Sequence, residues 1–94
     1  MPIETIPFDA APYFPDAESQ ARLISDALET GNAGYIAAAI GTIARARGMT
    51  QVAQEAGVTR ASLYKALSED GDPQLSTLIG VLNALGLKLT AHAA

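Results

Sequence analysis

The chain has 94 residues, enough for one small domain with a single core, and 49% of them are hydrophobic. It contains no cysteine, which excludes disulfides and thiolate metal sites, and no apolar run reaches the ~18 residues of a membrane span. Because the start of the chain also lacks the pattern of a signal peptide, we expect a cytoplasmic protein with no membrane partner.

The first 16 residues are expected to form an N-terminal arm of a single domain that spans residues 1–94. Proline interrupts any regular element in this arm, at Pro2, Pro7, Pro12 and Pro15. We expect three large aromatic side chains of the arm to dock on the domain or on a partner, namely Phe8, Tyr13 and Phe14.

Two helices are predicted over residues 17–47. Asp16 is a suitable N-cap for the first helix, and Asn32 is a suitable N-cap for the second. Gly41 lies inside the second helix, where glycine costs about 1 kcal/mol relative to alanine. We therefore expect another element to pack closely against Gly41.

Residues 50–67 are typical of two short helices joined by a tight turn, the helix-turn-helix that places its second helix in the DNA major groove. Gly57 lies where the first helix must end, because the turn favours a positive φ. Thr59 is a suitable N-cap for the second helix. Leu63 and Leu67 lie one turn apart and can anchor that helix to the core. The same residues would also suit a helical hairpin inside a bundle.

The second of these helices turns an arginine, a tyrosine and a lysine away from the core, a combination that suits phosphate and base-edge contacts. Two orientations remain open for Tyr64, which either stacks on a phosphate-sugar edge or folds back over Leu67. The predicted DNA-binding residues are Thr50, Gln51, Thr59, Arg60, Ala61, Tyr64 and Lys65.

Positive charge is concentrated around this motif. Residues 42–67 have a net charge of +3. By contrast, the whole chain has a net charge of −4, and residues 1–32 have a net charge of −5. Half of the basic side chains in residues 42–67 are Arg45 and Arg47, which suit either the negative end of a helix dipole or a DNA contact. The local positive balance favours DNA binding over the simple hairpin.

A loop over residues 68–73 and a final helix over residues 74–85 follow. This helix has an amphipathic stripe that we expect to lie in the core, formed by Leu75, Leu78, Ile79, Leu82 and Leu85. Residues 87–91 alternate apolar and polar, and predict a possible short C-terminal strand that would pair with a second copy or with the arm. We therefore expect an all-α fold of five helices with this strand as its one addition.

Three blocks of the chain form a recognisable set: Ile43-Ala-Arg-Ala-Arg-Gly48-Met-Thr-Gln51, Gly57-Val-Thr-Arg-Ala-Ser-Leu-Tyr-Lys-Ala-Leu67 and Asn83-Ala-Leu-Gly-Leu87. These blocks resemble the addiction-module antidote family, whose members have a lambda-repressor-like helix-turn-helix. With the acidic helix upstream and Tyr35-Ile-Ala-Ala-Ala-Ile-Gly41, the resemblance extends over nearly the whole chain.

This resemblance implies an antitoxin of a type II toxin–antitoxin module, which binds a small basic toxin of the RelE/ParE-like kind. It also implies a homodimer that binds its own promoter and represses the operon. The acidic residues that would complement such a toxin are Asp16, Glu18, Asp26 and Glu29. Two alternatives are a stand-alone helix-turn-helix repressor without a toxin, and a protein-interaction module that does not bind DNA.

Catalysis is not favoured by any group in the chain. His92 is the sole histidine and is the third residue from the end, where it has no cysteine partner. Glu69, Asp70 and Asp72 are close in sequence but lack the ligand pattern of a calcium loop. We therefore expect no enzyme, no metal site and no cofactor.

Overall fold

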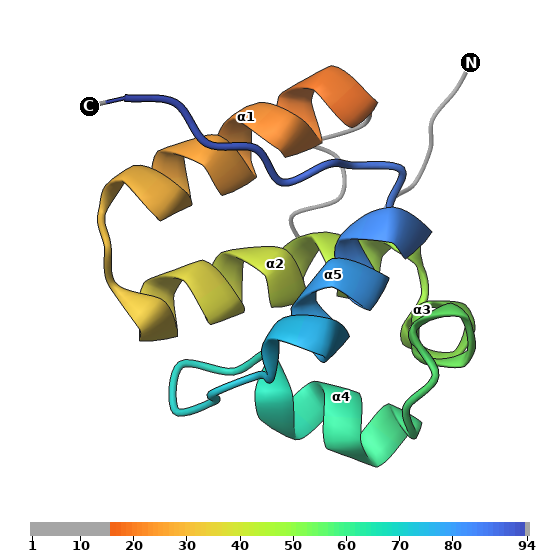
Figure 1. Ribbon diagram of the computed structural model, residues 1–94. Helices are drawn as coiled ribbons and strands as arrows, with labels where there is room; N and C mark the ends of the chain where they lie inside the picture. The colour runs from red at the N-terminus through yellow and green to blue at the C-terminus, as the bar shows by residue number, and fades with distance from the viewer. Residues whose placement is uncertain (1–15, 94) are drawn as a thin grey trace, which may run out of the picture.

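Helices α1 (Ala17–Glu29) and α2 (Ala33–Arg47) lie side by side and antiparallel in the computed structural model, which describes residues 16–93 (Figure 1). Helices α3 (Met49–Ala56), α4 (Arg60–Ala66) and α5 (Leu75–Ala84) follow. Helix α3 packs across α5, and α4 lies at the far side of α5 from α1. Over the described range the fold is all-α, with five helices and no strand.

Short polar side chains begin the first two helices, as the sequence predicts. Asp16 Oδ1 accepts a hydrogen bond from the Ser19 backbone N–H at 2.7 Å, and Asn32 Oδ1 accepts one from Tyr35 at 2.9 Å. Each bond satisfies a backbone donor that has no partner inside its helix. The turn between the helices contains Gly31 with φ +66°, a left-handed conformation that glycine adopts without strain.

All five helices contribute to one hydrophobic core. Its members include Ile24 of α1 and Met49 of α3, both 4% exposed. The largest side chains that are fully buried in the described residues are Ile40, Ile43, Val52, Leu63, Leu67, Val81 and Leu85. Because α3, α4 and α5 each bury part of this set, the core fixes how α3 and α4 sit relative to each other.

Two glycines allow close contacts between elements. A Cβ at Gly41 in α2 would overlap the carbonyl oxygen of Leu67, at the end of α4. A Cβ at Gly80 in α5 would meet the Cα of Ala56 in α3 at 3.2 Å. The close packing predicted for Gly41 from sequence is therefore confirmed, and it holds α2 against the end of α4.

The predicted strand at residues 87–91 is wrong. The Leu87 N–H bonds back to Leu82 O at 2.8 Å, and Gly86 has φ +75°, so the chain reverses direction as α5 ends. Residues 87–92 then run along α1, whose side chains Ala21, Ile24 and Leu28 line a groove with them. An isolated strand needs a partner, and no strand is assigned in the described part of the chain.

The prediction that the whole stripe of the final helix lies in the core is also wrong. Leu82 and Leu85 are buried and Leu78 is half-buried, but Leu75 is 64% exposed and Ile79 is 43% exposed. The helix packs on the core through the face that holds Val81. Its apolar pattern also includes Leu75 and Ile79, which the core does not cover.

The predictions for Phe8, Tyr13 and Phe14 lie outside the described residues. Among the described helices, none is both long enough and apolar enough to cross a membrane.

Candidate nucleic-acid interface

The turn between α3 and α4 is built from the residues predicted for it. Gly57 has φ +77° and ψ +28°, a left-handed conformation that ends α3. The Val58 N–H then donates to Ala53 O at 3.0 Å, and Ala53 is itself 3% exposed. Thr59 Oγ1 accepts from the Ser62 N–H at 3.0 Å and begins α4. The direction in which α4 leaves α3 is therefore fixed by local hydrogen bonds.

One face of α4 is buried and the other is exposed. Leu63 and Leu67 are 0% and 1% exposed and attach the helix to the core. Exposed on the remaining surface are Arg60, Ala61, Ser62, Tyr64 and Lys65. Helix α4 therefore presents a polar surface with a rigid support beneath it, as a helix that enters the DNA major groove requires.

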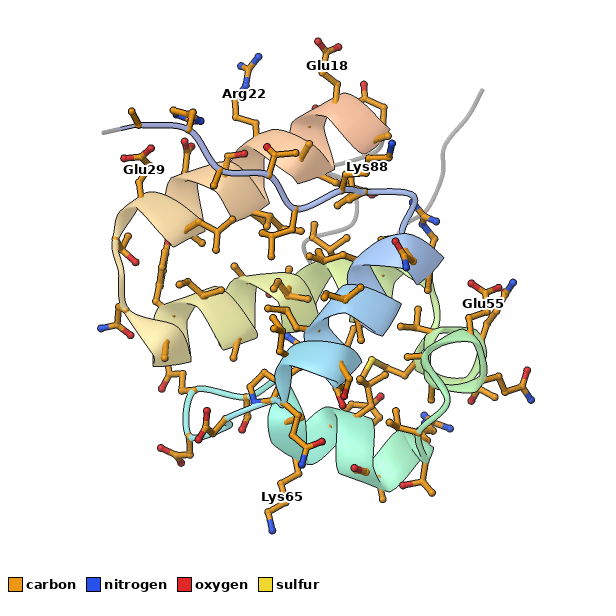
Figure 2. All side chains as sticks on the ribbon, in the orientation of Figure 1. Glu18, Arg22, Glu29, Glu55, Lys65 and Lys88 are labelled. Carbon is orange, nitrogen blue, oxygen red and sulfur yellow. The ribbon has the colours of Figure 1, made fainter. Side chains whose placement is uncertain are left out.

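A groove of about 690 Å³ lies between α4, α3 and the end of α2. Four of the seven predicted DNA-binding residues line it: Thr50 and Gln51 from α3, and Arg60 and Tyr64 from α4. Thr59, Ala61 and Lys65 do not line it. The Lys65 side chain extends from α4 into solvent, away from the rest of the protein (Figure 2).

Arg60 and Tyr64 form a stacked pair one helical turn apart. The Arg60 guanidinium carbon lies 5.5 Å from the centroid of the Tyr64 ring, and Arg60 Nη2 lies 3.5 Å from the Tyr64 hydroxyl oxygen. The ring is 40% exposed and lines the groove. A cation over an aromatic face is held electrostatically, which limits the directions in which Arg60 can point.

The two arginines at the end of α2 differ in their surroundings. Arg47 Nη2 donates to Gln20 Oε1 at 3.1 Å and to Leu85 O at 3.2 Å, and so joins α2 to α1 and to the C-terminal end of α5. Arg45 donates to Thr42 Oγ1 at 3.4 Å and lines the groove. Arg47 therefore has a structural role between helices that the sequence did not indicate, whereas Arg45 lies beside the candidate DNA-binding residues.

The groove residues that were absent from the sequence prediction include Gln54 and Glu55 of α3. Gln51 Nε2 donates to Glu55 Oε2 at 3.1 Å, which holds the carboxylate at the groove. A carboxylate repels phosphates but accepts a hydrogen bond from the cytosine amino group. The sequence offered no signal for Glu55 beyond its place one turn after Gln51.

The four predicted toxin-binding residues lie at the start of α1 and along it, and all are exposed. Glu18 and Glu29 extend outward from α1, and Arg22 does so between them (Figure 2). Asp16 has a local role as the N-cap, and hydrogen bonds from the backbone and side chain of Ser19 hold the pKa of its carboxyl below the ordinary value of 3.8. The outward acidic surface is therefore made by Glu18, Asp26 and Glu29.

Comparison with known proteins places this architecture in a family. Residues 4–93 match the model of a family described as "Probable addiction module antidote protein". A protein of Haemophilus influenzae, described as uncharacterized, is 41% identical over 81 residues, which are 86% of this chain and 84% of the relative. No solved structure was found to match. The chain therefore belongs to the probable addiction module antidote protein family.

Proposed function

We propose that this protein is the antitoxin of a type II toxin–antitoxin module. In this role it binds and neutralises a small toxin of the RelE/ParE-like kind, and as a dimer it represses its own operon. The observation that supports the proposal best is the family match over residues 4–93, because an antidote implies a toxin partner. Members of such a family act by binding and typically have no enzymatic activity, which agrees with a cytoplasmic binding protein that needs no cofactor.

DNA binding is assigned to α3 and α4 as a helix-turn-helix. Helix α4 would enter the major groove, where Arg60 suits guanine and Gln51 suits adenine. Arg45 and Lys65 flank these residues and suit phosphates. The support for this assignment is the exposed polar surface of α4, its buried leucine anchors and the groove shared with α3. Thr50, Thr59 and Ala61 are proposed as further contacts at its edges.

Toxin binding is assigned to the acidic surface of α1. A toxin that acts on RNA or on ribosomes carries a basic surface, and Glu18, Asp26 and Glu29 would complement it. Helix α1 contributes no residue to the groove between α3 and α4. One protomer can therefore bind the toxin and DNA through separate surfaces.

Affinity purification of the tagged protein from its native host, followed by mass spectrometry, tests this function. We expect a small basic protein in stoichiometric amount, encoded by a reading frame adjacent to the gene. A variant with Arg60→Ala and Lys65→Ala is the matched control, because it should lose DNA and keep the toxin. Recovery of the wild type without any such protein, together with promoter binding, would instead favour a stand-alone repressor.

Promoter binding is measured separately, by fluorescence anisotropy with the DNA upstream of the gene. Binding should weaken steeply as salt rises, because each neutralised phosphate contributes about −0.9 to the slope of log K against log salt. An affinity that does not depend on salt, or on Arg60 and Lys65, would contradict the assignment of α4. A chain that captures its toxin without binding DNA at all would be an interaction module.

A further inference from the structure

Residues 87–92 follow α5 and lie along α1, and we name them the C-terminal segment (Figure 1). Apolar and polar residues alternate over 87–91, which is typical of a strand, but no strand is assigned there. The Leu87 N–H donates to Leu82 O, whereas the main-chain groups of residues 88–92 have no hydrogen-bond partner among the described residues. The C-terminal segment therefore has the sequence pattern of a strand and an unpaired main chain.

A groove of about 450 Å³ lies between the C-terminal segment and α1. The residues of α1 that line it are Ala21, Ile24, Ser25, Leu28 and Glu29. Leu28 is 37% exposed and Leu89, from the C-terminal segment, is 42% exposed, although both line the groove. Covering these two side chains would remove apolar surface from water, which is favourable. The groove therefore offers a ligand apolar contacts beside a main chain that can form hydrogen bonds.

Negative charge is in excess around this groove. Residues 16–29 and 87–93 together hold four carboxylates against Arg22 and Lys88, a net charge of −2 with His92 neutral. Lys88 lies near one end of the C-terminal segment and Glu29 near the other (Figure 2), and both line the groove. Asp26 is exposed on the same helix. These surroundings favour a basic ligand over an acidic one, most of all at the end that holds Glu29.

We propose that an extended, basic segment of the toxin binds in this groove and pairs with the C-terminal segment as a second strand. When a partner adds a strand in this way, main-chain hydrogen bonds supply affinity and the adjacent side chains supply specificity. Leu28 and Leu89 would contact apolar side chains of the toxin segment, and Glu29 would contact its basic ones. The inference rests on the proposed antitoxin function, and it names the place on α1 at which the toxin binds.

A second copy of this chain fits the groove less well than a basic toxin does. It would bring its own Glu18, Asp26 and Glu29 close to those of the first copy, and like charges repel. The groove also lies apart from the candidate nucleic-acid interface, which is lined by no residue of α1 or of the C-terminal segment. A toxin bound here therefore leaves α4 accessible to DNA.

Amide hydrogen exchange measured by NMR tests the pairing directly. The full chain is compared with its complex with the small basic protein from the adjacent reading frame. In the free chain, the amides of residues 88–92 should exchange as fast as those of an unpaired segment. In the complex, every second amide should be protected by at least about tenfold, because successive residues of a strand pair through opposite edges. Simple covering of the segment would instead slow all of these amides alike.

Proline variants test whether the main chain supplies the affinity. Thr90→Pro and Ala91→Pro each remove one N–H donor, and both residues are exposed, so the core is left intact. One variant should bind the toxin about tenfold more weakly and the other should lose much less, because only one of the two N–H groups faces the toxin. Thr90→Ala and Ala91→Ser are the matched controls, since they change the side chain and keep the donor. Isothermal titration calorimetry measures binding, and circular dichroism should show unchanged helix content.

Three results would overturn the inference. If the toxin is bound but the amides of residues 88–92 exchange as in the free chain, or if both proline variants bind like their controls, the pairing is refuted and the antitoxin function stands. Alternating protection already present in the free chain would assign the pairing to another part of this chain or, if it grows with protein concentration, to a second copy. If no small basic protein is captured at all, the antitoxin function is refuted and this inference with it.

Discussion

The Arg60 guanidinium rests on the face of the Tyr64 ring, 5.5 Å from its centroid, with one helical turn between the two residues. This stack is formed on the surface of α4, before any DNA is bound. Arginine loses side-chain entropy when it binds a base edge or a phosphate, and a support that limits its orientations reduces that loss. On the proposed function, Tyr64 is therefore expected to position Arg60 for DNA.

Removing the Tyr64 ring should weaken promoter binding through Arg60. Tyr64→Ala should cost about 0.5 to 1 kcal/mol of binding free energy, and Arg60→Ala about 1 to 3 kcal/mol. Tyr64→Phe keeps the aromatic face and should bind nearly as well as the wild type. Fluorescence anisotropy on the promoter DNA measures all three.

The double variant with both Arg60→Ala and Tyr64→Ala shows whether Arg60 and Tyr64 act together. If Tyr64 works by positioning Arg60, the Tyr64→Ala change should have little effect once Arg60 is alanine. Fully additive losses would show that Tyr64 contacts DNA independently, and a strong loss in Tyr64→Phe would assign the effect to its hydroxyl group.

The local structure of the helices could be predicted from sequence because it depends on residues close in the chain. Asp16, Asn32 and Thr59 each accept a backbone hydrogen bond from three residues ahead, as an N-cap does. Gly57 adopts the left-handed conformation that its turn requires. N-cap and glycine preferences act within a single turn of helix, so the sequence can predict where a helix begins or ends from them.

Features that depend on tertiary contacts could not be predicted in the same way. Apolar spacing places Ile79 and Leu82 in one amphipathic pattern, but only the packing of α5 decides which of them the core covers. The two arginines of α2 look alike in sequence, and Arg47 is distinguished by Leu85 O, which is 38 residues away. The alternation at residues 87–91 indicated a strand, but the fold supplies no partner for it among the described residues.

Arg45 and Arg47 provide a matched pair of variants with opposite expected effects. Arg47→Ala removes two hydrogen bonds that join α2 to α1 and α5, so it should destabilise the fold by about 1.5 to 3 kcal/mol. Arg45→Ala should leave stability nearly unchanged and weaken promoter binding, lowering the magnitude of the salt slope by about 1. Urea denaturation and salt-dependent anisotropy measure the two effects. Equal loss of stability in both variants would contradict the distinction.

Gly41→Ala should destabilise the protein despite the higher helix propensity of alanine. A methyl group at this position overlaps the Leu67 carbonyl oxygen, so α2 must move away from the end of α4. The overpacking cost of about 1 to 3 kcal/mol should exceed the gain of up to about 1 kcal/mol from propensity. Urea denaturation measures the net change, and Ser25→Ala on the exposed surface of α1 is the control. A more stable Gly41→Ala protein would show that the contact is not tight.

Neutralising the acidic surface of α1 should weaken toxin capture and spare DNA binding. The triple variant Glu18→Gln, Asp26→Asn and Glu29→Gln keeps the helix and removes three negative charges. Electrostatic attraction speeds association, so the loss should appear mainly as a slower on-rate and should shrink at high salt. Surface plasmon resonance with the captured toxin measures this effect. Asp16 is left unchanged, because its carboxylate caps α1.

Capture of toxin by the triple variant at the wild-type rate at low salt would contradict the assignment of toxin binding to α1. Loss of toxin and promoter binding together would instead indicate a folding defect, which circular dichroism of the same preparation detects.

Growth of cells that express the small protein from the adjacent reading frame tests the antitoxin function most directly. We predict that this protein arrests growth by itself and that co-expression of the present chain restores growth, including when Arg60 and Lys65 are alanine and operon repression is lost. Growth that remains arrested in the presence of the folded chain, or a neighbouring protein that causes no arrest, would contradict the antitoxin function.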